Sequence, residues 1–474
     1  MADLGLAGKK VAMLVNNSCV YDSRVIKSAE TMASLGCSVT VVCRGEVGLA
    51  DNELRNEVRY RRVQKKSLSI GYCIHSLGRA ISGQLLAISL PVRFITLTCW
   101  GVFKRAIILA TRVTKSSAGV RIFKPHNKPS VDTLKNKGAQ PSHHLKNLLR
   151  DAARSAYKSL EHDEVNFVMR GVMRSIEPDI IHAHDLGTLS AGVAFAREHG
   201  AKLIYDSHEL EMHRNTSVTK CQAKRRRAEE ARGISVADSV ITVSKSIATH
   251  LASDYGIGTP TVIFNAPKKP FGLPYSMSEN FRYDAGFTTN DPCGVYVGGV
   301  TIDRGLENIL QAMVIWPEFK FATVGPKSPM FTKQFLGMAR ELGVSDRLRC
   351  LDPVSTGQVV QYVASADFSV LPLQNVCLSY YYCMPNKLFE SVLAGLPVAV
   401  SNLKDMTEFV DHWQCGLAFD ETDPVDIATT LKSLYAERDT YRLSGDRLDK
   451  FARLCSWEAQ GEKLERIYRK LAAA

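Results

Sequence analysis

The sequence KKVAMLVNNSCVYDSRVIKSAETMASLGCSVTVVCRG, residues 9–45, predicts a strand, a helix and a second strand in that order. Apolar residues dominate 11–15 and 39–42, as in two short buried strands, and they recur at helical spacing between 25 and 33. Gly36 follows the helical stretch, where a glycine commonly ends a helix. This order is typical of the first unit of a parallel βαβ sheet.

The same alternation returns twice along the chain. It resumes at Pro178 with strands in DIIHAHD, AKLIYDSHE and SVITVS, and again after a linker-like stretch, KKPFGLPYSMSENFRY at 268–283. The second series begins with CGVYVGG and ends with PVAVSN, residues 293–402. We therefore expect an α/β fold of two doubly wound, Rossmann-like domains that face a cleft at the carboxyl ends of their sheets.

The composition excludes several classes of protein. With 474 residues, of which 45% are hydrophobic, the chain is long enough for two domains and is not predominantly disordered. Twelve cysteines form no C-x-x-C pair and no regular framework, so we expect reduced thiols in a cytosolic compartment. Residues 1–10 lack an apolar run after a basic patch, and we expect no signal peptide.

The net charge of +12 is concentrated in an insert predicted at about residues 66–165. Residues 61–150 contain 17 Lys and Arg against one acid, whereas the rest of the chain contains 43 basic and 47 acidic residues. The apolar stretch at 84–113 is broken by Pro91 and by basic residues, so it is too short to span a bilayer. Its composition predicts contact with an anionic membrane surface. A helical hairpin covering the N-terminal domain is the alternative, and nucleic-acid binding is disfavoured because no reading motif is present.

Two glycines and an arginine mark the turn after CGVYVGG. Gly298 and Gly299 close that stretch, and Asp303-Arg304-Gly305 opens the next predicted helix. Small residues at a helix N-terminus let backbone N–H groups approach a phosphate, and an arginine fork can hold two of its oxygens. The pattern predicts a phosphate site with Gly299 and Arg304. An ordinary turn with a solvated arginine is the alternative.

A second candidate site lies in SYYYCMPNKLFESVLAGLP, residues 379–397. Pro385 favours a helix start, which places Asn386, Lys387 and Glu390 in the first two turns. An anion at this helix start would meet backbone donors and Lys387, while the carboxylate of Glu390 suits the vicinal hydroxyls of a ribose. Alternatively, Lys387 and Glu390 pair with each other on a solvated face.

Polar residues of the N-terminal half are candidates for the other side of the cleft. His184 ends the strand DIIHAHD, and an imidazole can exchange a proton near neutral pH. We also expect His208, in YDSHE, and Arg24, at the start of the first helix, on this side. Structural histidines and a solvated Arg24 paired with Asp22 are the alternatives. No zinc-like spacing accompanies these residues, so we expect no metal.

Together these stretches resemble the retaining, GT-B-fold glycosyltransferases of family 4. The resemblance covers roughly residues 8–60 and 178–474, through DIIHAHD, YDSHE, FNAP, YVGGVTIDRGLENILQA, ADFSVLPL, PNKLFESVLAGLPVAVS and CGLAFD. It implies that Arg304 holds the donor diphosphate, that Glu390 binds the ribose, and that His184 matches the second histidine of an H-x-H strand end. Tyr382 stands where the family carries the first glutamate of its Glu, seven residues, Glu signature, and Gly299 replaces an additional phosphate-binding arginine of many relatives.

The resemblance implies a transferase that moves a sugar from a nucleotide-diphosphate sugar with retention and without a cofactor. We expect an acceptor-side domain at 1–267, which includes Arg24 and His208, a nucleotide-sugar-binding domain at 268–455, and a helix at 456–474 that packs on the N-terminal domain. The insert predicts a peripheral protein on the cytosolic face of a membrane, with a glycan or lipid-linked acceptor there. A sugar-nucleotide epimerase or hydrolase of the same fold, and a non-catalytic membrane-bound scaffold, are the alternatives.

Overall fold

The computed structural model describes residues 5–64, 162–216, 218–269, 280–355 and 357–474. The chain divides into two compact units, one made of Met1–Arg62 with Val172–Ala474 and the other of Val63–Gly171. Nearly all of the insert predicted at 66–165, including its proposed membrane-binding stretch, lies outside the described residues. Among the described residues, no helix combines the length and apolar character that a membrane span requires.

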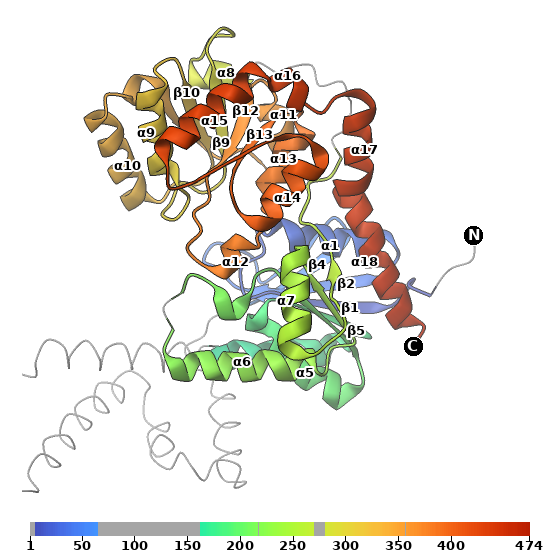
Figure 1. The fold of residues 1–474 in the computed structure, drawn as a ribbon. Coiled ribbons are helices and arrows are strands. Elements are labelled where there is room, and N and C mark those ends of the chain that lie inside the picture. The colour runs from blue at the N-terminus through green and yellow to red at the C-terminus, as the bar shows by residue number, and fades with distance from the viewer. Residues whose placement is uncertain (1–4, 65–161, 217, 270–279, 356) are drawn as a thin grey trace, which may run out of the picture. The chain divides into compact units, whose positions relative to one another are not determined.

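The N-terminal half forms an eight-stranded sheet in the order β3-β4-β2-β1-β5-β6-β7-β8. Strands β1, β2, β4 and β5 of this sheet are labelled in Figure 1. Neighbouring strands from β2 through β1, β5, β6 and β7 to β8 run parallel, which confirms the predicted doubly wound arrangement. The strands are β1 (Lys10–Leu14), β2 (Ser38–Arg44), β3 (Asn52–Arg55), β4 (Val58–Val63), β5 (Ile180–His184), β6 (Lys202–Ser207), β7 (Ser239–Thr242) and β8 (Thr261–Val262).

The hairpin of β3 and β4 forms one edge of this sheet, and we did not predict it from the sequence. Its strands are antiparallel, and Asn56 and Glu57 turn between them with φ angles of 49° and 63°. Positive φ at both central residues is the geometry of a two-residue hairpin turn, which Asn-Gly or Asp-Gly usually signals. Because a glutamate occupies the second position, that signal is missing here.

Four helices of the N-terminal half, α1 (Ser23–Ser34), α5 (Leu186–His199), α6 (Lys220–Ile234) and α7 (Lys245–Tyr255), connect these strands. Helix α1 begins where Asp22 accepts a hydrogen bond from the Val25 backbone N–H at 3.2 Å. This cap satisfies one of the free donors at the helix start. Side chains of α1, among them Val25, Ala29 and Met32, then fill the apolar cluster beside β1 and β2.

The C-terminal half forms a six-stranded sheet in the order β11-β10-β9-β12-β13-β14, with every neighbouring pair parallel. The strands are β9 (Cys293–Val297), β10 (Lys320–Val324), β11 (Leu348–Leu351), β12 (Phe368–Leu371), β13 (Val398–Ser401) and β14 (Gly416–Phe419). The helices are α8 (Asn280–Ala285), α9 (Leu306–Ile315), α10 (Pro329–Glu341), α11 (Val359–Val363), α12 (Leu378–Tyr381), α13 (Asn386–Leu393), α14 (Lys404–Trp413), α15 (Pro424–Ala436), α16 (Arg438–Tyr441) and α17 (Gly445–Cys455).

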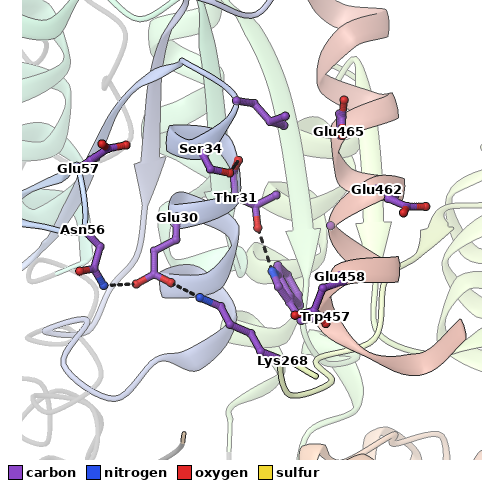
Figure 2. Close-up of a pocket in the computed structure, with 12 residues that line it drawn as sticks. Glu30, Thr31, Ser34, Asn56, Glu57, Lys268, Trp457, Glu458, Glu462 and Glu465 are labelled. Carbon is purple, nitrogen blue, oxygen red and sulfur yellow. Dashed lines mark hydrogen bonds and ion pairs between the residues drawn. The ribbon is translucent and has the colours of Figure 1, made fainter. Parts of the chain in front are cut away.

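The last helix, α18 (Trp457–Ala472), packs on the sheet of the N-terminal half. Trp457, Leu464 and Tyr468 belong to the same apolar cluster as β1 and β2. The Trp457 backbone N–H donates to the Pro267 carbonyl oxygen at 2.8 Å, and its indole Nε1 donates to Thr31 Oγ1 at 2.9 Å. Figure 2 shows the surface pocket beside this contact, whose acidic lining residues are Glu30, Glu57, Glu458, Glu462 and Glu465.

Candidate functional site

A cavity of about 230 Å³ is lined by residues of both halves. His208 follows β6 and Arg304 follows β9, so the cavity lies at the carboxyl ends of both parallel sheets, as the topology predicts. From the N-terminal half the lining residues are Asp22, Arg24, His208, Glu209, Val243, Ile247 and Asn265. From the C-terminal half they are Arg304, Leu373, Ser379, Tyr380, Cys383, Met384, Pro385 and Asn386.

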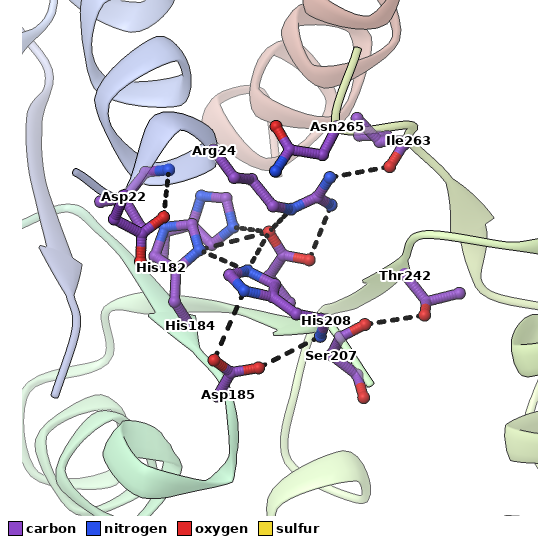
Figure 3. A network of polar contacts seen from close by, with 12 residues as sticks. Asp22, Arg24, His182, His184, Asp185, Ser207, His208, Thr242, Ile263 and Asn265 are labelled. Carbon is purple, nitrogen blue, oxygen red and sulfur yellow. Dashed lines mark hydrogen bonds and ion pairs between the residues drawn. The ribbon is translucent and has the colours of Figure 1, made fainter. Parts of the chain in front are cut away.

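A buried ion pair joins the cavity-lining Arg24 to Asp206 of β6, and Figure 3 shows the polar network around Arg24. Arg24 donates from Nε and Nη2 to the two carboxylate oxygens of Asp206 at 2.7 and 2.8 Å. Its Nη1 donates to the Ile263 carbonyl oxygen at 2.7 Å, so the guanidinium joins α1, β6 and the segment after β8. Both charged residues are almost completely buried, at 2% and 0% exposure. Such a pair requires the fork geometry of arginine, which matches both oxygens of a carboxylate.

Three histidines surround the same carboxylate. His182 Nε2, His184 Nδ1 and His208 Nε2 lie 3.5, 3.2 and 3.3 Å from Asp206 Oδ2. His184 Nδ1 is also 3.2 Å from His208 Nε2. On its other side, His208 Nδ1 lies 3.4 Å from Asp185 Oδ2. His208 therefore bridges two carboxylates and is the member of this group that lines the cavity.

Burial and the nearby carboxylates give His208 a different charge from His182 and His184. Burial lowers the pKa of His182 to about 3 and also lowers the pKa of His184, so both imidazoles are neutral. Burial acts in the same direction on His208, but Asp185 and Asp206 outweigh it and raise the pKa of His208 to about 9. The site therefore presents one imidazolium to the cavity, with a neutral imidazole directly behind it.

His184 lies behind the cavity rather than on its surface, and Arg24 has a different partner from the one that its alternative assumed. His184 is 1% exposed and is not among the residues that line the cavity. It contacts His208, which does line the cavity. Arg24 lines the cavity but is neither solvated nor paired with Asp22, so that alternative is wrong. The physical reason is that Asp22 caps α1, whereas Arg24 points inward to Asp206.

Arg304 lies at a tight turn before α9. Asp303 and Gly305 have φ angles of 61° and 67°, and a Cβ atom on Gly305 would come within 1.9 Å of the Pro372 carbonyl oxygen. Only glycine fits there without moving the backbone. The turn places the Arg304 guanidinium 5.5 Å from the ring centre of Tyr380, and in the described part of the chain its Nε is buried without a hydrogen-bond partner. Arg304 is thus a cavity-lining cation with an unused donor.

The start of α13 carries the other predicted donor-side residues. Asn386 lines the cavity, while Lys387 Nζ lies 3.0 Å from Tyr296 Oη, within hydrogen-bonding distance. Gly298 has a φ angle of 139°, a backbone conformation that L side chains rarely adopt, which explains the glycine there. Burial raises the pKa of Glu390, although Lys27 and Lys387 oppose the shift. The α13 N-terminus therefore borders the cavity, and Glu390 lies one turn behind it.

Gly299 contributes backbone to this region. Its carbonyl oxygen accepts a hydrogen bond from Tyr296 Oη at 3.1 Å, and an added Cβ would meet no atom closer than 3.9 Å. The same tyrosine ring lies 4.4 Å from Lys387 Nζ. Tyr296 thus links the glycine turn to α13, a connection that the sequence motifs do not reveal.

The sequence motifs also miss Tyr380 and Asn265 as lining residues. Tyr380 belongs to α12, where Ser379 Oγ accepts a hydrogen bond from the Leu210 backbone N–H of the N-terminal half at 3.2 Å. Asn265 Oδ1 accepts from Lys27 Nζ at 2.8 Å. Both residues lie in stretches that the sequence singles out, the tyrosine run at 380–382 and FNAP at 264–267, and these were the available signals.

Comparisons with known proteins support a transferase. A family model described as Glycosyl transferases group 1 matches residues 292–437, and one described as Glycosyltransferase Family 4 matches residues 121–266. A D-inositol 3-phosphate glycosyltransferase of Corynebacterium diphtheriae is 23% identical over 306 residues, 61% of this chain and 70% of that protein. A glycogen synthase of Mycobacterium tuberculosis is 24% identical over 272 residues, 56% of this chain and 62% of that protein.

Solved structures share the fold at low sequence identity. A sucrose-phosphate synthase from Thermosynechococcus elongatus has a TM-score of 0.66 and 16% identity, with 98% of this chain and 99% of that chain covered. Anabaena Alr3699/HepE in complex with UDP has a TM-score of 0.62 and 12% identity, with 97% and 100% covered. These likenesses confirm the predicted GT-B fold of two Rossmann-like domains.

Proposed function

We propose that this chain, which belongs to the group 1 glycosyltransferases of the family 4-like type, transfers a sugar from a nucleotide-diphosphate donor to a glycan or lipid-linked acceptor at a membrane, with retention. The observation that carries the proposal is one cavity that combines anion-binding groups of the C-terminal half with an imidazolium of the N-terminal half. The first group suits a diphosphate, and the second suits the reacting end of a sugar.

The donor diphosphate is assigned to Arg304 and to the start of α13. Arg304 has an unused buried Nε, and the first backbone N–H groups of α13 begin at Asn386, which lines the cavity. Together with Lys387 they can neutralise the charge that develops on a leaving diphosphate. Glu390 is assigned to the ribose hydroxyls. In this scheme the protein supplies the positive charge without a metal or a cofactor.

The imidazole chemistry is assigned to His184 and His208 acting as a pair. His208 faces the cavity and can donate a hydrogen bond to a sugar or to the leaving oxygen. His184 helps to position His208 through their 3.2 Å contact and so affects the reaction from behind, while Asp185 and Asp206 favour the charge of His208. Arg24 supports the same side by fixing Asp206.

The acceptor and the location rest on the insert. Its 17 basic residues over 61–150 and its broken apolar stretch favour an anionic membrane surface. An enzyme held there peripherally, on the cytosolic face, would meet lipid-linked acceptors. This part of the proposal depends on sequence composition alone.

A transfer assay with the full chain tests the proposal. Nucleotide-diphosphate sugars that raise the melting temperature are selected first, because a ligand of the native state stabilises it by mass action. Each of these nucleotide sugars is then prepared with a label on its sugar and incubated with the protein, with and without membrane lipid. Label that reaches the lipid only when the protein is present supports transfer. Free sugar without acceptor favours a hydrolase, a changed nucleotide sugar favours an epimerase, and binding without turnover favours the scaffold that Tyr382, in place of a glutamate, suggests.

A further inference from the structure

A second group of ligand-type side chains lies outside the cavity. His213, in the short helix η3 (Glu211–His213), meets His250 and Asp254 of α7. One ligand atom from each of the three residues lies within 4.8 Å of the other two. The rings of His213 and His250 are perpendicular, with centres 5.0 Å apart, and His250 Nε2 is 3.6 Å from Asp254 Oδ2. None of the three lines the cavity assigned to the transfer reaction.

The chemistry of these atoms is that of a metal site. We propose that His213, His250 and Asp254 bind one divalent transition-metal ion of the zinc class. Two imidazoles and a carboxylate are common zinc ligands, with a fourth position left to water. At bond lengths of about 2.0–2.2 Å, tetrahedral ligand atoms lie roughly 3.4 Å apart. The separation of 3.6 Å on α7 is already close to this value, and the His213 ligand atom lies within 4.8 Å of both others.

The state of the two histidines favours an ion. In the described part of the chain, His250 Nε2 is buried and has no hydrogen-bond partner, although it lies beside a carboxylate. The neutral form of an imidazole has a ring nitrogen with a lone pair, which is the form that binds a metal ion. A metal ion would use the lone pairs of both rings together with the charge of Asp254.

Arg227 is the competing partner and must be displaced. Its Nη1 lies 3.1 Å from Asp254 Oδ2, but the side chain is 52% exposed and its guanidinium also lies 5.6 Å from the ring centre of Tyr255. It can therefore leave the carboxylate and keep a partner. The cluster of His182, His184 and Asp206 has similar ligand types but differs here, because a buried Arg24 holds both oxygens of Asp206. We therefore assign the ion only to the cluster of His213, His250 and Asp254.

An ion at this place would fix one wall of the cleft. It would tie η3 to α7, and the Leu210 backbone N–H just before η3 bonds to Ser379 Oγ of α12. The His250 ring lies 6.3 Å from the ring of Tyr382, which follows α12. Metal occupancy would thus hold the segment that carries the cavity-lining Tyr380.

The test is a metal titration of the full chain, freed of any polyhistidine tag and of bound metal. Zn²⁺ is titrated against a chromogenic chelator, and Co²⁺ is used to record the visible absorption of the bound ion. We expect one equivalent to bind. Losing a group that only supports a ligand costs roughly 10–100-fold in metal affinity, so His213→Ala and His250→Ala should each lose at least about a hundredfold.

Two matched variants distinguish this site from adventitious binding. His412→Ala removes an exposed histidine elsewhere on the surface and should leave the affinity unchanged. Arg227→Ala removes the competitor and should bind Zn²⁺ more tightly than the wild type. If a histidine variant without metal melts at a lower temperature than the wild type, Asp254→Asn is tested in its place, because it removes a ligand charge and keeps the side-chain shape. Absence of binding, or equal affinity in wild type, His213→Ala and His250→Ala, overturns the proposal.

Discussion

The Asp206→Asn variant keeps the shape of the side chain and removes the charge that holds Arg24. Asp206 is fully buried and accepts two hydrogen bonds from this arginine at 2.7 and 2.8 Å. The guanidinium cannot lose its proton, so the variant leaves a buried charge without its carboxylate. Breaking a buried pair from one side costs about 3–5 kcal/mol. We expect a loss of this size in the free energy of unfolding of the N-terminal half.

Thermal unfolding followed by circular dichroism measures this loss. In a domain of about 150–250 residues, 1 kcal/mol lowers the melting temperature by about 2–4 °C, so the transition should fall by about 6–20 °C. The control is the double variant Arg24→Met with Asp206→Asn, which removes both charges and should be more stable than Asp206→Asn alone. The reasoning would be refuted if Asp206→Asn lowered the melting temperature by less than about 2 °C. It would also be refuted if the stability lost in the double variant equalled the sum of the losses in Arg24→Met and Asp206→Asn.

Three further results are expected. The pKa of His208 is raised from 6.5 to about 9, so protonated His208 stabilises the fold fully below pH 6.5, and this contribution is lost as the pH rises toward 9. The free energy of unfolding in urea should therefore decline across this range in the wild type but not in His208→Gln. Arg304→Ala and Glu390→Gln should each weaken nucleotide-sugar binding about ten- to a hundredfold by calorimetry, and undiminished binding in both contradicts the assigned donor site. Neutralising the basic residues between 93 and 112 should release the protein from anionic vesicles in co-sedimentation while donor binding survives, and equal sedimentation would favour the helical-hairpin alternative.

The sheets could be predicted because their strands are short apolar runs followed by helices of clear period. Residues 11–15 and 39–42 pair as expected in β1 and β2, and the series from 293 gives β9 to β13 in a parallel sheet. The β3–β4 hairpin could not be predicted, because its turn at Asn56 and Glu57 lacks the glycine that marks such turns. Local signals therefore define most of the fold.

The candidate site could be predicted only in part, because its polar groups are selected by tertiary contacts. Arg304 and Asn386 line the cavity, as their positions at helix starts indicate. The partner of Arg24 could not be predicted. Asp22 is close to Arg24 in sequence, but it caps α1, and Arg24 pairs instead with Asp206 on β6. Similarly, the spacing of His250 and Asp254 on α7 is common, and only the fold brings His213 to them.

If Glu390 binds the donor ribose as proposed, donor recognition also involves the N-terminal half through Lys27, whose charge acts on Glu390. This lysine of α1 donates to Asn265 and to the Ala266 carbonyl oxygen, and its Nζ lies 4.8 Å from the Trp457 ring centre. Burial lowers the pKa of Lys27 to about 7 while Glu390 opposes the shift, and burial raises the pKa of Glu390 while Lys27 opposes it. Each group thus favours the charged form of the other where water is scarce. An ionised carboxylate only accepts hydrogen bonds, which suits ribose hydroxyls, so on the proposed assignment of Glu390 the lysine of one half supports the ligand of the other.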